Sequence, residues 1–295
     1  MTIKLIIAGI KWSCEVPDAI FNESILSFSS DFIGDEDINL EIRFTDCFDV
    51  PIGKSITNEV LEWYVRKDSN ISYQLIKRDE YNSDILVSLK TNEAWSDVLI
   101  EAKYSSLTVI EIINILFVEI VFRNRLHFHD GFVMHSSAIE FEGEAIAFAA
   151  PSGTGKSTHT GLWQEYYKAK IINDDHPAVR IINGKPIIFG TPWAGETKKY
   201  NNTSSILKGV VVLEQGDINK IWTLNNNEIL KEFMPRCFLP YYNSEILVRT
   251  LRIFNDLVNY IKIYKLICKP DKEAVMLVKK YVWTNKQNSG MVICE

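Results

Sequence analysis

Short apolar runs separated by polar turns dominate the first part of the chain. Runs of this length predict β-strands, here at Lys4–Ile10, Asn39–Phe44, Ile71–Lys77 and Ile85–Leu89. From Ser106 to Arg125 apolar residues continue without a turn signal, which predicts a core helix. Glu111, Asn114 and Glu119 interrupt it, so it falls short of the roughly 20 apolar residues that span a bilayer. We expect a small N-terminal α+β domain at residues 1–125, ending in this helix.

Residues 126–295 alternate strand and helix patterns, which predicts an α/β domain and an α+β chain overall. Asn183-Gly184 lies between two apolar runs and predicts a tight hairpin. A helix is expected directly after Ser157. The other expected strands are Val133–Ile139, Ala145–Ala150, Lys170–Ile172, Gly209–Leu213 and Ile221–Leu224, and the later helices are Glu228–Met234, Ser244–Tyr264 and Asp271–Val282.

A glycine-rich segment between an expected strand and an expected helix carries the most specific chemistry. It reads Ala150-Pro-Ser-Gly-Thr-Gly-Lys-Ser157-Thr158, close to the phosphate-loop consensus G-x-x-x-x-G-K-[ST]. Ala150 stands where the first glycine belongs. In such a loop, successive backbone N–H groups and the helix N-terminus hold phosphates. The alternative is a chance glycine-rich turn, which the matching strand and helix disfavour.

This segment predicts ATP and Mg²⁺ as cofactors. Lys156 would place its ammonium on the terminal phosphates, and the Ser157 hydroxyl would ligate a magnesium ion that bridges them. The expected nucleotide-binding residues are Ser152, Gly153, Thr154, Gly155, Lys156, Ser157 and Thr158.

An acidic pair, Asp174-Asp175, follows the expected strand Lys170–Ile172. Neighbouring side chains on an extended chain point in opposite directions, so one carboxylate can face the metal while the other faces an incoming hydroxyl. The alternative is a solvated Asp-Asp turn.

The run His135–Ile139, the core Ser152-Gly-Thr-Gly-Lys-Ser157 and the pair Asp174-Asp175 resemble the catalytic domain of HPr kinase/phosphorylase, which shares its phosphate loop with phosphoenolpyruvate carboxykinase. The resemblance covers about residues 130–200 well. It implies a P-loop domain of that type, with Asp174 as the base toward a serine hydroxyl and Asp175 as a metal ligand. His135 matches the histidine that this family has near the site, where it would orient the base or tune its charge. A purely structural histidine is the alternative.

The segment from Gly190 to Lys199 combines glycines, Trp193, Glu196 and two lysines, a mixture typical of a substrate-contacting loop. Glu196 is a further candidate metal ligand, and Lys198 could neutralise phosphate charge. Alternatively, Trp193 fills the core and the charges are solvated. The glycine-rich acidic signature of true HPr kinases is missing here, so a biosynthetic peptide or a small hydroxyl compound is at least as good a candidate acceptor as HPr.

Composition limits the classes of binding partner that we expect. The net charge of −6 and the lack of long Lys/Arg runs argue against nucleic acid or an anionic membrane as partner. The five cysteines are scattered without a Cys-x-x-Cys pair, as expected for a reducing cytoplasm. The sequence leaves open whether the protein forms a homo-oligomer.

These features predict an ATP- and Mg²⁺-dependent serine kinase that acts on a protein or peptide. Two alternatives stay open. One is a small-molecule kinase of the carboxykinase-like group. The other is an inactive nucleotide-binding regulatory module, in which residues 1–105 bind a partner.

Overall fold

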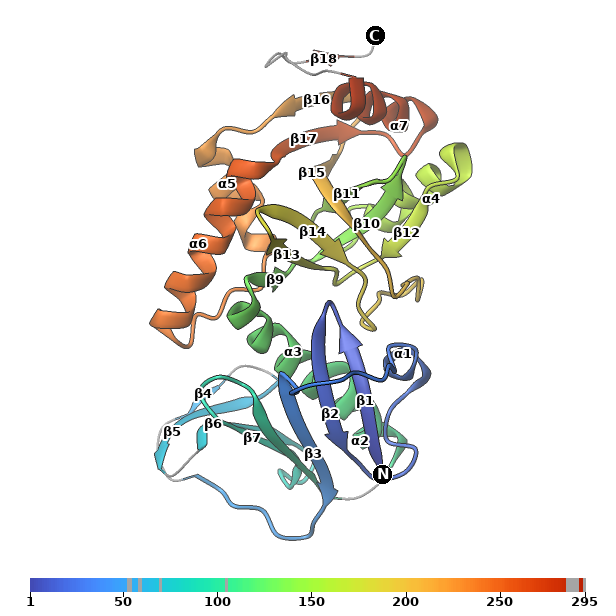
Figure 1. The fold of residues 1–295 in the computed structure, drawn as a ribbon. Coiled ribbons are helices and arrows are strands. Elements are labelled where there is room, and N and C mark those ends of the chain that lie inside the picture. Colours follow the sequence, from blue (N-terminus) through green and yellow to red (C-terminus); the bar gives the residue numbers. More distant parts are fainter. Residues whose placement is uncertain (52–54, 58–59, 69–70, 104–105, 285–291, 294–295) are drawn as a thin grey trace. The chain divides into compact units, whose positions relative to one another are not determined.

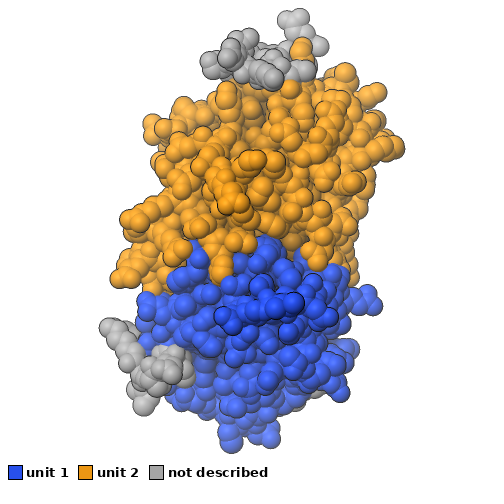
Figure 2. Space-filling view, in the orientation of Figure 1, with its two compact units in different colours: residues 1–128 blue, residues 129–295 orange. Residues whose placement is uncertain are grey.

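The fold is given by a computed structural model (Figure 1). It describes residues 1–51, 55–57, 60–68, 71–103, 106–284 and 292–293. The chain forms two compact units, residues 1–128 and 129–295 (Figure 2). Each unit has its own β-sheet with helices, so the chain is a mixed α+β protein.

Unit 1 is built on an eight-stranded sheet with the order β1-β2-β3-β8-β7-β6-β5-β4. Its strands are β1 Thr2–Ile7, β2 Ile10–Glu15, β3 Ile38–Phe44, β4 Ile56–Thr57, β5 Glu62–Asp68, β6 Ile71–Arg78, β7 Ile85–Thr91 and β8 Asp97–Ala102. The helices are α1 Glu23–Leu26, α2 Leu107–Ile112, η1 Ile113–Phe117, which is π-helical, and α3 Val118–Leu126.

The first predicted strand, Lys4–Ile10, is wrong in its extent. The chain turns at Ala8 and Gly9, which both have positive φ (51° and 78°), and β1 pairs antiparallel with β2 as a hairpin. Two such residues match the twist of a two-residue hairpin turn. The predicted core helix is present as α2, η1 and α3, and its residues Val109, Ile113, Phe117 and Val121 are buried, four apart on one face.

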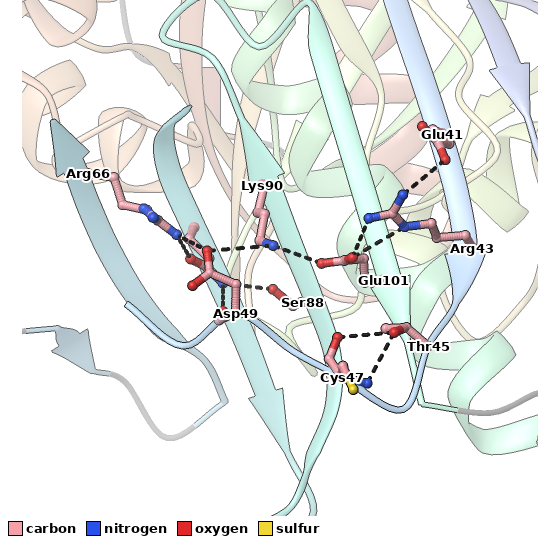
Figure 3. A network of polar contacts seen from close by, with 10 residues as sticks. Glu41, Arg43, Thr45, Cys47, Asp49, Arg66, Ser88, Lys90 and Glu101 are labelled. Carbon is pink, nitrogen blue, oxygen red and sulfur yellow. Dashed lines mark hydrogen bonds and ion pairs between the residues drawn. The ribbon is translucent and has the colours of Figure 1, made fainter. Parts of the chain in front are cut away.

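One face of the unit 1 sheet carries a closed network of charged and polar side chains (Figure 3). Glu101 on β8 accepts hydrogen bonds from Arg43 on β3 (2.7 Å) and Lys90 on β7 (2.9 Å). Arg66 on β5 pairs with Asp49 at 2.6 Å, and Lys90 lies 3.8 Å from Asp49. We call these five residues the Glu101 network.

Unit 2 has a ten-stranded sheet with the path β12-β10-β11-β15-β14-β13-β9, extended from β15 through β17, β16 and β18. The strands are β9 Gly131–Val133, β10 Ser136–Phe141, β11 Glu144–Ala149, β12 Lys170–Asn173, β13 Ala178–Ile182, β14 Lys185–Phe189, β15 Ser204–Gln215, β16 Lys220–Thr223, β17 Lys262–Cys268 and β18 Val292–Ile293. The helices are α4 Lys156–Tyr167, α5 Asn226–Glu232, α6 Ser244–Tyr260 and α7 Lys272–Lys279, with short helical segments η3 Met234–Arg236 and η4 Lys280–Thr284. The short helical turn η2, His127–His129, lies at the boundary between the two units.

The central strands of unit 2 are buried on both faces, with a different set of helices on each (Figure 1). Phe148 of β11 packs in one core cluster with Trp163 of α4 and Val278 of α7. The next residue along, Ala149, belongs to the other cluster, with Phe254 of α6. This alternation follows from the two-residue period of a strand.

The predicted helix Ser244–Tyr264 ends earlier than expected. α6 stops at Tyr260, and Lys262–Cys268 forms strand β17, which pairs in parallel with β15. The apolar residues of this strand fill a place between β15 and β16, so sheet pairing outweighs the continued helical pattern. Among the described residues, no helix is long and apolar enough to cross a membrane.

Candidate active site

The predicted phosphate loop joins β11 to α4 in unit 2. Gly153 and Gly155 adopt φ of 77° and 99°, backbone conformations that favour glycine. A Cβ at either position would meet no other atom within 4 Å, so the loop surface stays open. Gly155 caps the N-terminus of the twelve-residue helix α4, whose first N–H groups have no partner inside the helix. Unpaired backbone donors at this point suit an anionic ligand.

Lys156 is the first residue of α4 and is largely buried, with 7% of its surface exposed. Its Nζ donates to the backbone carbonyl of Ala150 at 3.2 Å and lies 3.1 Å from Nε2 of His135. Burial lowers the pKa of Lys156, the charge of Asp175 opposes this effect, and Arg236 adds to it. The ammonium is therefore held between the loop and the acidic pair.

Asp175 lies on the other side of His135. Its Oδ1 is 3.1 Å from His135 Nε2, and its Oδ2 is 3.5 Å from His176 Nε2. Burial would raise the pKa of Asp175, but the hydrogen bond from His135 and the charges of His176, His135 and Lys156 outweigh it and lower the pKa. The carboxylate is about a quarter exposed (27%), so it is both ionised and reachable.

One ring nitrogen of His135 lies within hydrogen-bond distance of both Lys156 and Asp175. Nε2 is 3.1 Å from the Lys156 ammonium and 3.1 Å from the Asp175 carboxylate. With a proton on Nε2 it donates to Asp175, and without one it accepts from Lys156. The geometry therefore brings together three of the predicted site residues: His135, Lys156 and Asp175.

Asp174 has a different environment. It is 2% exposed, and its carboxylate accepts from the Gly195 N–H (2.7 Å), the Thr197 hydroxyl and the Lys199 N–H (3.4 Å). A carboxylate bound by three donors inside the fold is poorly placed to take a proton from an acceptor. Asp175 is the more accessible of the two carboxylates, whereas the sequence analysis expected the base at Asp174.

The turn that carries both aspartates is fixed by Asn173, which is fully buried. Its Oδ1 accepts from the backbone N–H groups of Asp175 and His176, both at 2.8 Å. Its Nδ2 donates to the carbonyls of Thr191 and Trp193 at 3.0 and 3.1 Å. One amide side chain thus ties the acidic turn to the loop that follows β14.

The residues predicted to ligate magnesium are spread out. Ser157 is partly exposed at the start of α4, and no hydrogen bond from its hydroxyl is recorded within the described part of the chain. Glu196 is exposed and makes no recorded contact there with Ser157 or Asp175. Within the described residues, no three His, Cys, Asp or Glu side chains cluster around a metal position. Ser157 fits a magnesium ion that takes its other ligands from phosphate and water.

No protein-family model matches the chain, and no curated protein matches it. Among solved structures, the Hpr(Ser) kinase/phosphatase from Coxiella burnetii is similar, with 9% sequence identity and a TM-score of 0.28 over 51% of this chain and 87% of that chain. At this level the similarity assigns no function.

The loop from Gly190 to Lys199 packs against the core and the acidic pair more closely than its composition suggested. Trp193 is 6% exposed and its carbonyl binds Asn173, which agrees with a core role for this residue. Lys198 is exposed, with a φ of 52°. Gly195 packs against the acidic pair, since a Cβ there would lie 3.3 Å from the Asp175 Cβ.

Two residues that contact the site were not singled out as functional by sequence reasoning: His176 and Asn173. His176 directly follows the acidic pair, and its ring also packs edge-on against Phe238. A polar residue on each side of an Asp-Asp pair was the available signal, but the partners that tie these two residues to the rest of the fold lie 15 to 62 residues away in sequence.

Proposed function

We propose that the protein is an ATP- and Mg²⁺-dependent kinase that transfers the γ-phosphate to a serine hydroxyl of a protein or peptide. The observation that carries this proposal is the convergence of the Lys156 ammonium and the Asp175 carboxylate on His135 Nε2, each at 3.1 Å, beside an open phosphate loop. Phosphoryl transfer needs a cation for the phosphates and a base for the acceptor at one place.

The phosphate side of the reaction falls to the loop and the start of α4. Backbone N–H groups of residues 153–157 and the Lys156 ammonium would hold the β- and γ-phosphates. Ser157 would hold Mg²⁺ together with phosphate oxygens and water, and the ion would neutralise charge on the phosphates. The hydrogen-bond partners of the Lys156 ammonium, the Ala150 carbonyl and His135 Nε2, are uncharged when the histidine is neutral, so the ammonium can turn toward a phosphate.

The acceptor side falls to Asp175. The serine oxygen forms a bond to the γ-phosphorus, the bond from that phosphorus to the bridging oxygen of ADP breaks, and the serine proton passes to the Asp175 carboxylate. His135 and His176 hold one carboxylate oxygen each, which orients the base. Asp174 anchors the loop at Gly195–Lys199 rather than reacting.

The test is transfer of label from γ-labelled ATP and Mg²⁺ to peptides and proteins encoded beside the gene. We expect Lys156→Ala to lose about 10²- to 10³-fold in rate and Asp175→Asn about 10²- to 10⁴-fold. Lys185→Ala, at the exposed first residue of β14, is the matched control and should behave as the wild type. Melting temperatures verify that the variants are folded.

Full transfer by Asp175→Asn would refute the assignment of the base. ATP binding without transfer to any acceptor would refute the kinase and favour a nucleotide-binding regulatory module. Label on a small hydroxyl compound, with none on peptides, would favour the carboxykinase-like alternative.

A further inference from the structure

A basic groove lies beside β12 in unit 2. It has a volume of about 670 Å³, and its lining includes Lys168, Lys170, Lys199, Gln164, Tyr200 and Asn201. The three lysines are exposed. Lys168 and Lys170 flank the start of β12, and Lys199 comes from the loop after β14. We call this feature the lysine groove.

The positive charge of the lysine groove is not neutralised within the fold. The Lys168 ammonium donates to the Glu165 carbonyl at 3.1 Å, and the Lys199 ammonium donates to the Gln164 amide oxygen at 3.1 Å. Both acceptors are uncharged. Over the residues that the structure describes, none of the three lysines forms an ion pair. Glu140 is the acidic residue of the lining; it lies opposite Lys170 in the β10–β12 register without pairing.

The lysine groove is joined to the candidate active site by the main chain. The Asp174 N–H donates to the Lys199 carbonyl at 3.0 Å, and the Lys199 N–H lies 3.4 Å from the Asp174 carboxylate. Along β12, Lys170 is followed by Ile171, Ile172 and Asn173, and then by the acidic pair. Lys170 and Asp175 are five residues apart, and because the chain turns after Asn173 they are separated by at most about 16 Å. An extended peptide with its serine at Asp175 would therefore reach Lys170 within about five residues.

We propose that the lysine groove docks an acidic segment of the peptide acceptor, with its carboxylates about five residues from the phosphorylated serine. This inference rests on the proposed kinase function. Three uncompensated ammonium groups in a short groove complement a cluster of carboxylates. A long polyanion such as nucleic acid would also meet the rest of a chain whose net charge is −6, which opposes it.

The experiment measures binding of fluorescein-labelled twelve-residue peptides to nucleotide-free protein by fluorescence anisotropy. Each peptide has one serine and three Glu residues centred five positions before or after it. The control peptides carry Gln in place of Glu. We expect one of the two acidic peptides to bind, the Gln peptides to bind at least tenfold more weakly, and 0.5 M salt to weaken binding.

Charge reversal locates the contact. Lys170→Glu and Lys199→Glu should each weaken the acidic peptide by about two- to fivefold relative to wild type, and by roughly tenfold or more together. Lys185→Glu makes the same change at an exposed residue of β14 outside the groove lining and should leave the dissociation constant unchanged. Equal binding by the reversed variants, or equal binding of Glu and Gln peptides, would overturn the proposal. A single-stranded oligonucleotide that binds more tightly and responds to the same variants would overturn it in favour of nucleic acid.

Two further variants separate this inference from the kinase function. Lys156→Ala and Asp175→Asn should lose transfer but keep the wild-type affinity for the acidic peptide. Transfer that shows no preference for the acidic peptide over its Gln control would refute the groove alone. Loss of transfer with every acceptor, while acidic peptides still bind at the lysines, would refute the kinase and leave the groove as a docking site.

Discussion

The Glu101 network and the lysine groove differ in whether their cationic side chains form ion pairs. In the Glu101 network of unit 1, Arg43, Lys90 and Arg66 each contact a carboxylate, at 2.6 to 2.9 Å (Figure 3). In the lysine groove of unit 2, the ammonium groups of Lys168 and Lys199 donate to neutral oxygens and form no ion pair within the part of the chain that the structure describes. Charged groups that form ion pairs within the fold stabilise the fold, whereas exposed ammonium groups without an ion pair can bind a partner.

Burial explains the difference. The Glu101 side chain is only 5% exposed, and an isolated ionised carboxylate in that environment would be very costly. The register of the sheet supplies the remedy, since Arg43 lies directly opposite Glu101 on β3 and Lys90 lies on the neighbouring β7. The groove lysines are exposed, so water solvates them and the fold tolerates the lack of partners.

The largest expected effect is on the buried member of the network. Glu101→Gln keeps the shape of the side chain but removes the nearest carboxylate of Arg43 and Lys90, which are left with Glu41 at 3.7 Å and Asp49 at 3.8 Å. We expect it to lower the free energy of unfolding by about 3 kcal/mol. Lys170→Gln, the same kind of neutralisation in the groove, should change it by less than about 0.5 kcal/mol. Urea unfolding followed by circular dichroism measures both. Equal effects would remove the distinction between the two regions.

The same distinction applies within the acidic pair. Asp174 is bound by three donors, whereas Asp175 faces the site. Asp174→Asn leaves one backbone donor facing an NH₂ group, so we expect a loss of about 2 kcal/mol in the free energy of unfolding. Asp175→Asn should cost less than half of that. The two variants are compared by thermal and urea unfolding. A larger loss for Asp175→Asn would show that our assignment of the structural and the reactive carboxylate is reversed.

The sequence predicted the parts of the site that are local. The loop from Ser152 to Thr158 has its chemistry in consecutive residues, and the structure places Gly155 and Lys156 at the start of α4 as expected. The strand and helix patterns gave the α+β class. Local patterns succeed in these places because the deciding interactions lie within one turn or one strand.

Sequence could not assign the two aspartates or reveal the network. The environment of Asp174 depends on Gly195, Thr197 and Lys199, which lie 21 to 25 residues away. Arg43 and Glu101 are 58 residues apart. Such contacts follow from the register of non-adjacent strands and from loop paths, and a pattern of neighbouring residues does not contain that information.

Acid pH offers a reversible version of the Glu101 substitution. Burial would raise the pKa of Glu101, but the hydrogen bonds from Arg43 and Lys90 outweigh it and lower the pKa below the ordinary value of 4.5. A lowered pKa means that the stabilisation is fully present above pH 4.5 and is lost as the pH falls through the folded-state value. The difference in unfolding free energy between wild type and Glu101→Gln should therefore be constant from pH 8 to 5 and narrow below 4.5. A difference that widens on acidification would contradict the pairing.

Within the network, the smallest effect is expected at its exposed edge. The Arg43 side chain is about half exposed (52%), and after Arg43→Gln the buried carboxylate still has Lys90 at 2.9 Å. Because the arginine is exposed and the carboxylate keeps a second cation, we expect this ion pair to contribute about 0.2 to 1 kcal/mol and to be screened by salt. Urea unfolding at 0.05 M and 0.5 M salt should give a small loss that shrinks at the higher salt, unlike the loss for Glu101→Gln. If Arg43→Gln lowers the free energy of unfolding as much as Glu101→Gln, then the arginine, and not burial of the carboxylate, determines the stability of the network. Exposure of a charged side chain would then no longer indicate that it is available to bind a partner.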